Sequence, residues 1–299
     1  MVAAPRLAAR LGLKSLLLKD ETRNPTRCLK DRATAIAVTL ATANGYRDMY
    51  CASAGNAAIS LAGFCANHGL GCHVFVPSEA SQTRLNWLRR YGADIHVSTG
   101  NYDQAYDEAE RAGAENGWYS RNCAFNPFLV EGKKTVAFEM GEQLGWQAPD
   151  LIVAPVGDGC TLGAIGKGFR ELEAVGLTDE IPQLIGIQSE AIQPLVRRHR
   201  GDDSGGDNGN AQAASIAVRR PRNTLRLLSE IRLSNGLMLG VSDEHISSAQ
   251  RTLAEEAGVV AEFTSAAALA GLIQLAEHES LENKSAVLVI TGGRLDSDF

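Results

Sequence analysis

One lysine, Lys30, directly follows a turn and precedes a long Ala-rich stretch. The Asn24-Pro25 pair marks the turn, and Thr26 is a candidate cap for a helix over Asp31–Ala43. A lysine held in this position is partly desolvated, which lowers its pKa and lets the neutral amine attack a carbonyl carbon to form a Schiff base. Most lysines at helix starts are merely solvated. Lys30 therefore becomes a catalytic candidate only through the support of other segments.

A second segment predicts a phosphate site. The apolar stretch Leu151–Val156 ends in Gly157 and Gly159, and a helix is expected to open near Thr161. Small residues let the backbone approach a ligand, and unpaired N–H groups at a helix start favour an anion. A dinucleotide would also need an acid at the end of the next strand, where Gln188 stands instead. A monophosphate on a cofactor is favoured, and a ligand-free Gly-rich turn is the alternative.

Two further strand ends carry polar side chains. Ser53 and Asn56 lie where a strand gives way to a helix, a place suited to a substrate carboxylate, although plain helix capping is the first explanation of this segment taken by itself. Thr291 follows the apolar stretch Ala286–Ile290. Its hydroxyl either hydrogen-bonds a ring nitrogen of a ligand or simply ends the strand.

Short apolar stretches alternate with helical stretches along most of the chain, which predicts an α/β fold with mostly parallel sheets and helices on both faces. Ligands then bind beyond the carboxyl ends of the strands. The Gly/Asp/Asn-rich segment Gly201–Asn210 is expected to be a mobile loop. Strands are expected at Leu16–Leu18, Met49–Ala52, His73–Val76, Ile95–Val97, Leu151–Ala154, Leu184–Gln188 and Ala286–Ile290, and helices at Asp31–Ala43, Asn56–His68, Ser81–Tyr91, Tyr102–Asn116, Gly132–Leu144, Leu162–Ala174, Thr224–Ser234, Asp243–Glu256 and Ser265–Ala276.

Composition excludes several classes of protein. A net charge of −6, without a basic stripe interleaved with aromatics, argues against a nucleic-acid partner. The apolar stretches are too short to cross a membrane. Scattered cysteines without a CxxC pair indicate reduced thiols and a cytoplasmic protein. No histidine pair has zinc spacing, so no metal is expected; the cysteines are 28, 51, 65, 72, 123 and 160, and the histidines are 68, 73, 96, 199, 245 and 278.

Together and in this order, the segments resemble the fold-type II enzymes that use pyridoxal phosphate (PLP), the tryptophan synthase β class, and within it threonine synthase. The resemblance implies a PLP cofactor, a small amino-acid substrate and a homodimer. It also implies two lobes, each a twisted, mostly parallel sheet flanked by helices, with a smaller substrate-clamping lobe over 44–131 and a larger PLP-binding lobe over 1–43 plus 132–299. The matching segments are 16–32, 52–62, 126–145, 154–169, 221–228, 261–271 and 290–296.

The resemblance also implies a role for each candidate residue. Lys30 resembles the Schiff-base lysine, which also removes the α-proton once the substrate amine has displaced it. Thr291 resembles the hydroxyl that faces the pyridine nitrogen, which suits elimination and replacement better than transamination. Asn56 resembles the asparagine that binds the phenolic oxygen, Ser53, Ala54, Gly55 and Asn56 resemble the substrate-carboxylate loop, and Gly157, Asp158, Gly159, Cys160 and Thr161 resemble the phosphate cup.

The chain departs from the family pattern in three places. Arg27-Cys28-Leu29 replaces the usual Gly-Ser-Phe/Val, and Arg27 either binds a substrate anion or faces solvent. Asp158 replaces an asparagine or glycine, so its carboxylate must point away from a bound phosphate. Leu129 replaces an arginine suited to the phosphate of O-phosphohomoserine. Cys28 and Cys160 are expected to be small packing residues beside the cofactor.

The sequence therefore favours a PLP-dependent lyase or synthase that converts O-phosphohomoserine to threonine. A serine/threonine dehydratase or a cysteine synthase-like β-replacement enzyme is the alternative, because Leu129 removes one phosphate anchor. A non-catalytic PLP-binding protein and a nucleotide-dependent oxidoreductase are further alternatives. The oxidoreductase hypothesis depends on Gly157 and Gly159 alone.

Overall fold

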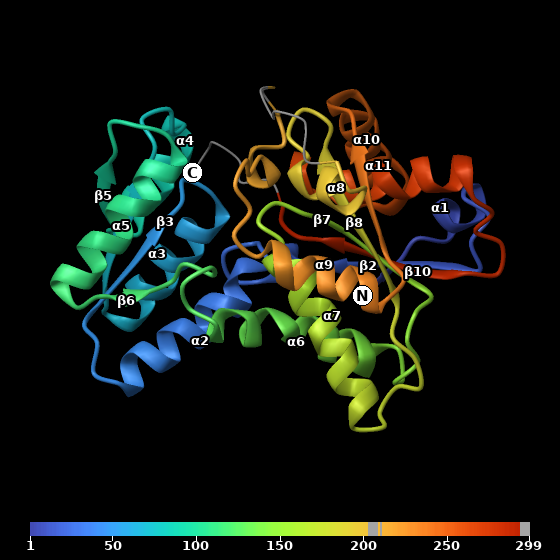
Figure 1. The fold of residues 1–299 in the computed structure, drawn as a ribbon, viewed down its shortest axis with the longest axis horizontal. Helices are drawn as coiled ribbons and strands as arrows, with labels where there is room; N and C mark the ends of the chain where they lie inside the picture. The colour runs from blue at the N-terminus through green and yellow to red at the C-terminus, as the bar shows by residue number, and fades with distance from the viewer. Residues whose placement is uncertain (203–208, 210, 294–299) are drawn as a thin grey trace. The chain divides into compact units, whose positions relative to one another are not determined.

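The computed structural model describes residues 1–202, 209 and 211–293 of the 299-residue chain. Contacts divide it into two compact units: Met1–Arg23 with the described residues from Lys134 onward, and Asn24–Lys133 (Figure 1). Most of the expected loop over Gly201–Asn210, and residues 294–296 of the last matching segment, lie outside the described residues. No helix in the described ranges is long and apolar enough to cross a membrane.

The larger unit is built on a six-stranded sheet in the order β1-β2-β10-β7-β8-β9. Only the pairing of β1 with β2 is antiparallel. The central strands are nearly continuous apolar stretches, as expected for parallel strands covered on both faces. The strands are β1 (Val2–Ala3), β2 (Ser15–Asp20), β7 (Leu151–Pro155), β8 (Gln183–Ser189), β9 (Leu237–Val241) and β10 (Ser285–Ile290).

Helices cover both faces of this sheet (Figure 1). α11 packs on four of the strands and is backed by α10, whereas α7 and α9 pack together on the other face. Fully buried alanines at 266–268 let α11 approach the sheet closely, and Gly271 presses against Ile187. The helices are α1 (Pro5–Arg10), α7 (Cys160–Ala174), α8 (Pro194–His199), α9 (Thr224–Leu233), α10 (Asp243–Ala257) and α11 (Phe263–His278), with short 3-10 turns at Glu21–Arg23 and Ala214–Ile216.

The smaller unit has a four-stranded, all-parallel sheet in the order β5-β4-β3-β6. One face packs on α5 through a cluster that includes Tyr50, Phe75 and Ala109. α3 contacts β3 and β4, and α2 packs on α3. The strands are β3 (Asp48–Ala52), β4 (Gly71–Val76), β5 (Asp94–Val97) and β6 (Tyr119–Ser120), and the helices are α2 (Lys30–Ala43), α3 (Asn56–His68), α4 (Gln82–Arg90) and α5 (Tyr102–Asn116).

The chain passes from the smaller to the larger unit within α6 (Phe128–Gln143). The contacts separate the units after Arg23 and after Lys133, whereas the sequence prediction placed these boundaries after residues 43 and 131. The first boundary differs because α2 packs on α3, which assigns residues 24–43 to the smaller unit. The predicted assignment of substrate binding to one lobe and PLP binding to the other stays a prediction.

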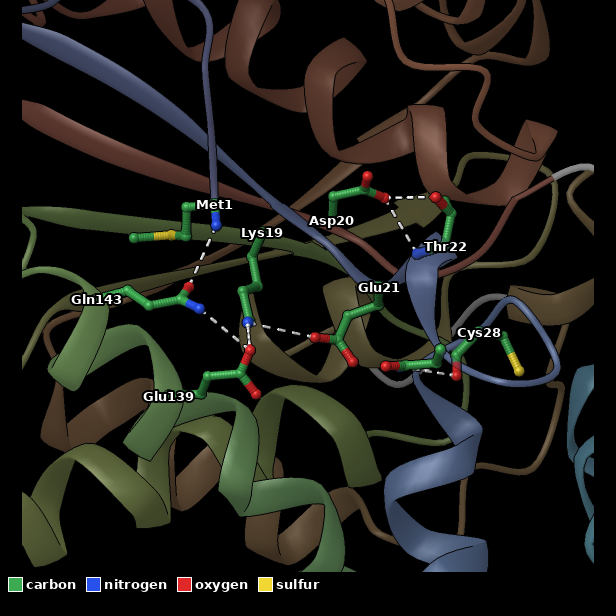
Figure 2. Close-up of polar contacts among 9 residues, drawn as sticks. Met1, Lys19, Asp20, Glu21, Thr22, Cys28, Glu139 and Gln143 are labelled. Carbon is green, nitrogen blue, oxygen red and sulfur yellow. Dashed lines mark hydrogen bonds and ion pairs between the residues drawn. The ribbon is translucent and has the colours of Figure 1, made fainter.

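A nearly buried lysine ties β2 to α6 in the larger unit (Figure 2). Lys19 Nζ lies 2.6 Å from Glu139 Oε1 and 3.6 Å from Glu21 Oε1. The side chains of Lys19 and Glu21 are only 4% and 1% exposed. Glu139 Oε1 also accepts a hydrogen bond from Gln143, whose own oxygen accepts one from the amine of Met1. The network therefore fixes the end of β2, from which the chain runs toward Lys30.

We expect Lys19→Met to lower the free energy of unfolding by about 3–5 kcal/mol, because it removes a cation shared by two carboxylates, one of them buried. The matched control is Arg10→Met. Arg10 pairs with Glu256 but is 44% exposed, so its loss is expected to cost less than about 1 kcal/mol. Urea unfolding followed by circular dichroism measures both, and equal losses in the two variants would contradict the prediction.

Candidate active site

Lys30 is the first residue of α2, whose N-cap is Leu29. Thr26 does not cap this helix, contrary to the sequence prediction. Its N–H donates to Asp31 Oδ2 at 2.7 Å, and its hydroxyl donates to Asp31 Oδ1. Thr26 and Asp31 are both buried, so these two bonds fold the turn back onto the first turn of α2 and fix the backbone around Lys30.

Arg27 has a left-handed backbone with φ of 62°, at the position where the family resemblance led us to expect glycine. Its N–H donates to the carbonyl of Asn24 at 2.8 Å, which closes the turn, and its side chain is exposed. In this left-handed conformation a residue with a Cβ is strained, whereas glycine is not. The turn thus keeps the local shape that glycine would give and adds a positive charge three residues before Lys30.

Two buried cations lie near Lys30 in the smaller unit. Arg121 donates to the carbonyl of Lys30 at 3.2 Å and to Thr34 Oγ1 at 3.2 Å. Lys133 donates to Cys123 Sγ at 3.2 Å. Arg121 and Lys133 are each only 2% exposed. The sequence analysis did not identify either residue, because only the packing of the segment after β6 and of α6 brings them to α2.

These surroundings lower the pKa of Lys30 below its usual range. Burial is the first cause, and the positive charges of Lys133 and Arg121 act in the same direction, whereas Cys123 opposes them. A lower pKa leaves a larger fraction of the amine neutral at physiological pH. The neutral amine is the form that attacks carbonyl carbon, so the environment of Lys30 suits the chemistry that its position suggested.

Cys28 is not a nucleophile in this environment. Burial, and after it the negative charge of Asp31, raises the pKa of the Cys28 thiol to about 12. Its sulfur lies 3.6 Å from Thr26 Oγ1 and 3.8 Å from the carbonyl of Asn56. Cys28 therefore serves as a small packing residue between the turn and the start of α3.

The loop between β3 and α3 leaves a helix N-terminus without a side-chain cap among the described residues. Ser53 does not cap α3, because its Oγ accepts a hydrogen bond from the N–H of Gly55 at 3.1 Å. Residues 53–56 are all partly exposed. An uncapped N-terminus of a 13-residue helix favours an anion such as a carboxylate, so the capping alternative does not explain this segment.

Arg84 adds a positive charge at this loop, and the sequence analysis did not identify it. An ideal Cβ built on Gly55 would lie 3.0 Å from Arg84 Nη1, so the guanidinium lies directly against the glycine backbone. Arg84 is half-buried in the first part of α4. Leu129, which stands where an arginine was expected, is fully buried and contributes no charge. In the smaller unit, Arg84 is therefore a cation beside the predicted carboxylate loop.

In the larger unit, the glycine segment between β7 and α7 forms a tight turn into another helix N-terminus. Gly159 is the N-cap of α7 with φ of 90°, and no side chain of the described residues caps this helix. A Cβ on Gly157 would lie 2.9 Å from the carbonyl of Ser215, and one on Gly159 would lie 3.1 Å from Leu227 Cβ. A side chain at either glycine would be crowded by neighbouring atoms. Without one, the backbone N–H groups at the start of α7 are accessible to an anion.

The carboxylate of Asp158 is held by the segment that precedes α9. It accepts hydrogen bonds from the N–H of Arg222 at 2.5 Å and from the side-chain amide of Asn223. The N–H of Asn223 also donates to the carbonyl of Asp158 at 3.2 Å. The negative charge is thus compensated by N–H donors from residues 222–223, which is what an aspartate beside a phosphate site requires.

Thr291, at the end of β10, lies against a serine that the sequence analysis did not identify. Thr291 Oγ1 is 2.9 Å from Ser265 Oγ. Ser265 is fully buried at the start of α11, where it accepts from the N–H of Gly292 and donates to the carbonyl of the same residue. This contact, in which either hydroxyl can be the donor, holds the Thr291 hydroxyl in place beside Ser265.

These donor sets suit PLP in each unit taken by itself. The smaller unit supplies an amine with a lowered pKa, suited to an aldehyde. The larger unit supplies an uncapped helix N-terminus, suited to a phosphate, and a fixed neutral hydroxyl, suited to a ring nitrogen. The role of each residue stays a prediction.

The family model for pyridoxal-phosphate dependent enzymes (PALP) matches residues 1–292 of the chain. The chain belongs to this family. PLP is its cofactor, and the protein is a PLP-dependent lyase of the α/β, fold-type II class. The fold class and cofactor predicted from the sequence are thereby confirmed.

Curated relatives of this PLP-dependent enzyme include threonine synthases. That of Methanocaldococcus jannaschii is 37% identical over 291 residues, covering 96% of this chain and 72% of that protein. That of Mycobacterium leprae is 34% identical over 297 residues, covering 99% and 81%. Similar solved structures include threonine deaminase isoform 2 of Solanum lycopersicum (TM-score 0.82, 20% identity, 99% and 85% covered) and maize serine racemase (TM-score 0.83, 18% identity, 99% and 88% covered), which support the fold alone.

We expect Cys28 to resist alkylation by iodoacetamide at pH 8, where a thiol of pKa about 12 is ionised in only about one molecule in 10⁴. Because the thiolate is the reactive form, labelling should rise as the pH approaches 12. Peptide mass spectrometry measures the labelling, with the partly exposed Cys123 as the internal comparison. Labelling of Cys28 as fast as that of an unperturbed thiol at pH 8 would contradict the prediction.

Proposed function

We propose that this enzyme is a threonine synthase, which converts O-phosphohomoserine and water to threonine and inorganic phosphate. The observation that carries the proposal is the lowered pKa of Lys30 beside buried Arg121 and Lys133, in a chain related to threonine synthases over almost its whole length. When bound, PLP supplies an electron sink that stabilises negative charge on the α-carbon of an amino acid.

In the smaller unit, Lys30 would hold PLP through its amine and later accept the proton that leaves the substrate α-carbon. Its lowered pKa supports both roles, because each needs a neutral amine. Ser53, Ala54 and Gly55 would bind the substrate carboxylate through the uncapped start of α3. Asn56, the first residue of α3, would bind the phenolic oxygen of PLP.

In the larger unit, Gly157 through Thr161 would bind the phosphate of PLP at the start of α7. Asp158 and Cys160 would contribute backbone, because the Asp158 carboxylate is already engaged by Arg222 and Asn223. Thr291, oriented by Ser265, would face the pyridine nitrogen. A neutral hydroxyl there supports elimination and replacement over transamination.

The phosphate of the substrate needs an anchor other than Leu129. We propose that Arg84 and Arg27 take this role. Arg84 lies against Gly55 of the carboxylate loop, and Arg27 is an exposed cation three residues before Lys30. The buried Leu129 is also the observation that favours the second candidate, a serine/threonine dehydratase or β-replacement enzyme, which acts on substrates without a phosphate.

The deciding experiment adds O-phosphohomoserine, threonine or serine to the purified enzyme and follows the visible spectrum, inorganic phosphate and the amino-acid or oxo-acid products. A threonine synthase releases phosphate and threonine in a 1:1 ratio. Formation of an oxo-acid from threonine or serine, without phosphate release from O-phosphohomoserine, would establish the dehydratase instead. A spectrum that no amino acid changes would indicate a non-catalytic PLP-binding protein.

We expect Lys30→Ala to abolish both the visible absorbance of bound PLP and turnover, because it removes the amine that would join the aldehyde. Borohydride treatment of the wild-type enzyme should fix PLP on the peptide that contains Lys30, as mass spectrometry would show. The matched control is Lys14→Ala, an exposed lysine of the larger unit that should leave both signals unchanged. PLP fixed on another lysine would refute the assignment.

We expect Arg84→Met to raise the KM for O-phosphohomoserine at least about tenfold, because a charged contact to phosphate is lost, while PLP absorbance stays unchanged. Arg27→Gly should raise KM as well. It also relieves the left-handed backbone, so the loss cannot come from unfolding. Arg89→Met, an exposed arginine on the same helix as Arg84, is the control. An unchanged KM in both variants would show that neither arginine binds the phosphate of the substrate.

We also propose a cytoplasmic homodimer. The six free cysteines support a reducing compartment, and the family resemblance supports the dimer. Sedimentation velocity of the PLP-loaded enzyme measures the oligomeric state.

A further inference from the structure

Three metal-ligating side chains converge on the smaller unit, apart from the residues assigned to PLP or substrate. They are His73 on β4 and Asp94 and His96 on β5. The parallel register places His73 directly opposite Asp94, and His96 lies two residues further along β5, on the same face. Tyr50 of β3 pairs with His73 and packs against α5. The three side chains therefore lie on the face of the sheet that α5 covers. β5 is one of the two edge strands of the sheet (Figure 1).

The three donor atoms form a nearly equilateral triangle. His96 Nε2 lies 3.3 Å from Asp94 Oδ2, and His73 Nδ1 lies 3.4 Å from the same oxygen. The two ring nitrogens are 3.5 Å apart. All three separations lie at the long end of hydrogen-bond distances. Each is close to the edge of about 3.3–3.4 Å of a tetrahedron whose centre lies about 2.0–2.1 Å from its corners, the geometry of zinc bound by imidazole and carboxylate.

We propose that His73, Asp94 and His96 bind a Zn²⁺ ion. Two imidazoles and one carboxylate are ligands that zinc accepts, and three protein ligands leave a fourth position for water. Asp94 is 63% exposed and His96 is 36% exposed, so the ion and a water molecule have access from solvent. The carboxylates of Asp94 and Asp48 give the cluster a negative charge that favours a dication.

The residues around the cluster orient the ligands. His73 Nε2, the nitrogen that does not face the triangle, lies 3.3 Å from Asp48 Oδ1. When a carboxylate accepts a hydrogen bond from the second ring N–H of a ligating histidine, it fixes the tautomer of the ring and raises the basicity of the ligating nitrogen. The His73 ring also stacks on Trp118 with centroids 3.6 Å apart, and the His96 ring stacks on Phe75 at 4.4 Å. Both rings are thus held in place before an ion binds, which lowers the entropic cost of binding.

The bound ion would fasten the edge strand β5 to β4. Binding to the folded state alone raises the stability of the smaller unit in proportion to the logarithm of zinc concentration over Kd. This role is independent of the proposed threonine synthase reaction, because it involves none of the residues from which that reaction was argued.

The test is equilibrium dialysis of the PLP-loaded, full-length protein against ZnCl₂. We expect one high-affinity ion per chain in the wild type, with affinity lowered at least about 100-fold in His96→Gln and at least about tenfold in Asp94→Asn. Asp48→Asn should weaken binding by about 10–100-fold through His73. The matched control is His68→Gln, an exposed histidine of the same unit whose ring bonds only the carbonyl of Phe64 among the described contacts. It should bind zinc as the wild type does.

Far-UV circular dichroism and the melting temperature without zinc establish that each variant folds. Added ZnCl₂ should then raise the melting temperature of the wild type and of His68→Gln, and not that of His96→Gln. Co²⁺ in place of Zn²⁺ should give the intense visible bands of a tetrahedral site. Absence of a bound ion in the wild type would overturn the proposal. So would zinc bound with equal affinity by His96→Gln and Asp94→Asn, because the ion would then lie elsewhere.

Discussion

The proposed chemistry of Lys30 depends on the free-energy cost of keeping positive charges in a poorly solvated region. Lys30, Arg121 and Lys133 share one region of the smaller unit, and the last two are almost fully buried. Arg121 donates hydrogen bonds to the carbonyl of Lys30 and to Thr34, which hold its guanidinium in place. Burial and the neighbouring positive charges shift the protonation equilibrium of Lys30 toward its neutral form, which is the form that attacks a carbonyl carbon.

Each unit also has a helix N-terminus that favours an anion. The starts of α3 and α7 have no side-chain cap in the described structure, although each follows a strand end with a hydroxyl residue nearby. Ser53 bonds Gly55 instead, and Asp158 bonds the segment before α9. Backbone N–H groups at both helix starts thus remain directed outward from the carboxyl ends of parallel strands, where this fold class binds its ligands. Each unit thus has an uncapped helix start that follows a parallel strand, and the two are formed by different sequences.

Much of the fold could be predicted from the sequence, because most elements carry a local signal. The periodicity located the helices Asn56–His68 and Tyr102–Asn116 to the residue. β9 (Leu237–Val241) was missed although the turn residues Asn235 and Gly236 precede it, because its short apolar stretch, interrupted by Gly240, carries little strand periodicity of its own. β6 was missed because two residues carry no periodicity, and only its pairing with β3 makes it a strand. α1 and α8 are single short turns of helix that begin with proline.

The candidate site was likewise predicted only in part. Lys30, Gly159 and Thr291 stand at element boundaries, which are visible in the sequence. Arg121, Lys133 and Arg84 were not identified, because tertiary packing alone brings them to Lys30 and Gly55. The histidines were dismissed as structural because their spacing lacks a zinc motif. The register of two neighbouring strands, which the sequence does not specify, places His73 beside Asp94 and His96.

The left-handed backbone at Arg27 limits which amino acids can occupy the position before Cys28. Glycine fits there without cost, and asparagine or aspartate can adopt the same conformation through local hydrogen bonds. Valine, isoleucine and threonine are branched at Cβ and would distort the turn that delivers Lys30. Saturation mutagenesis of this codon should therefore separate small or unbranched replacements from branched ones, whatever their charge, and the surviving set would report the shape of the turn independently of catalysis.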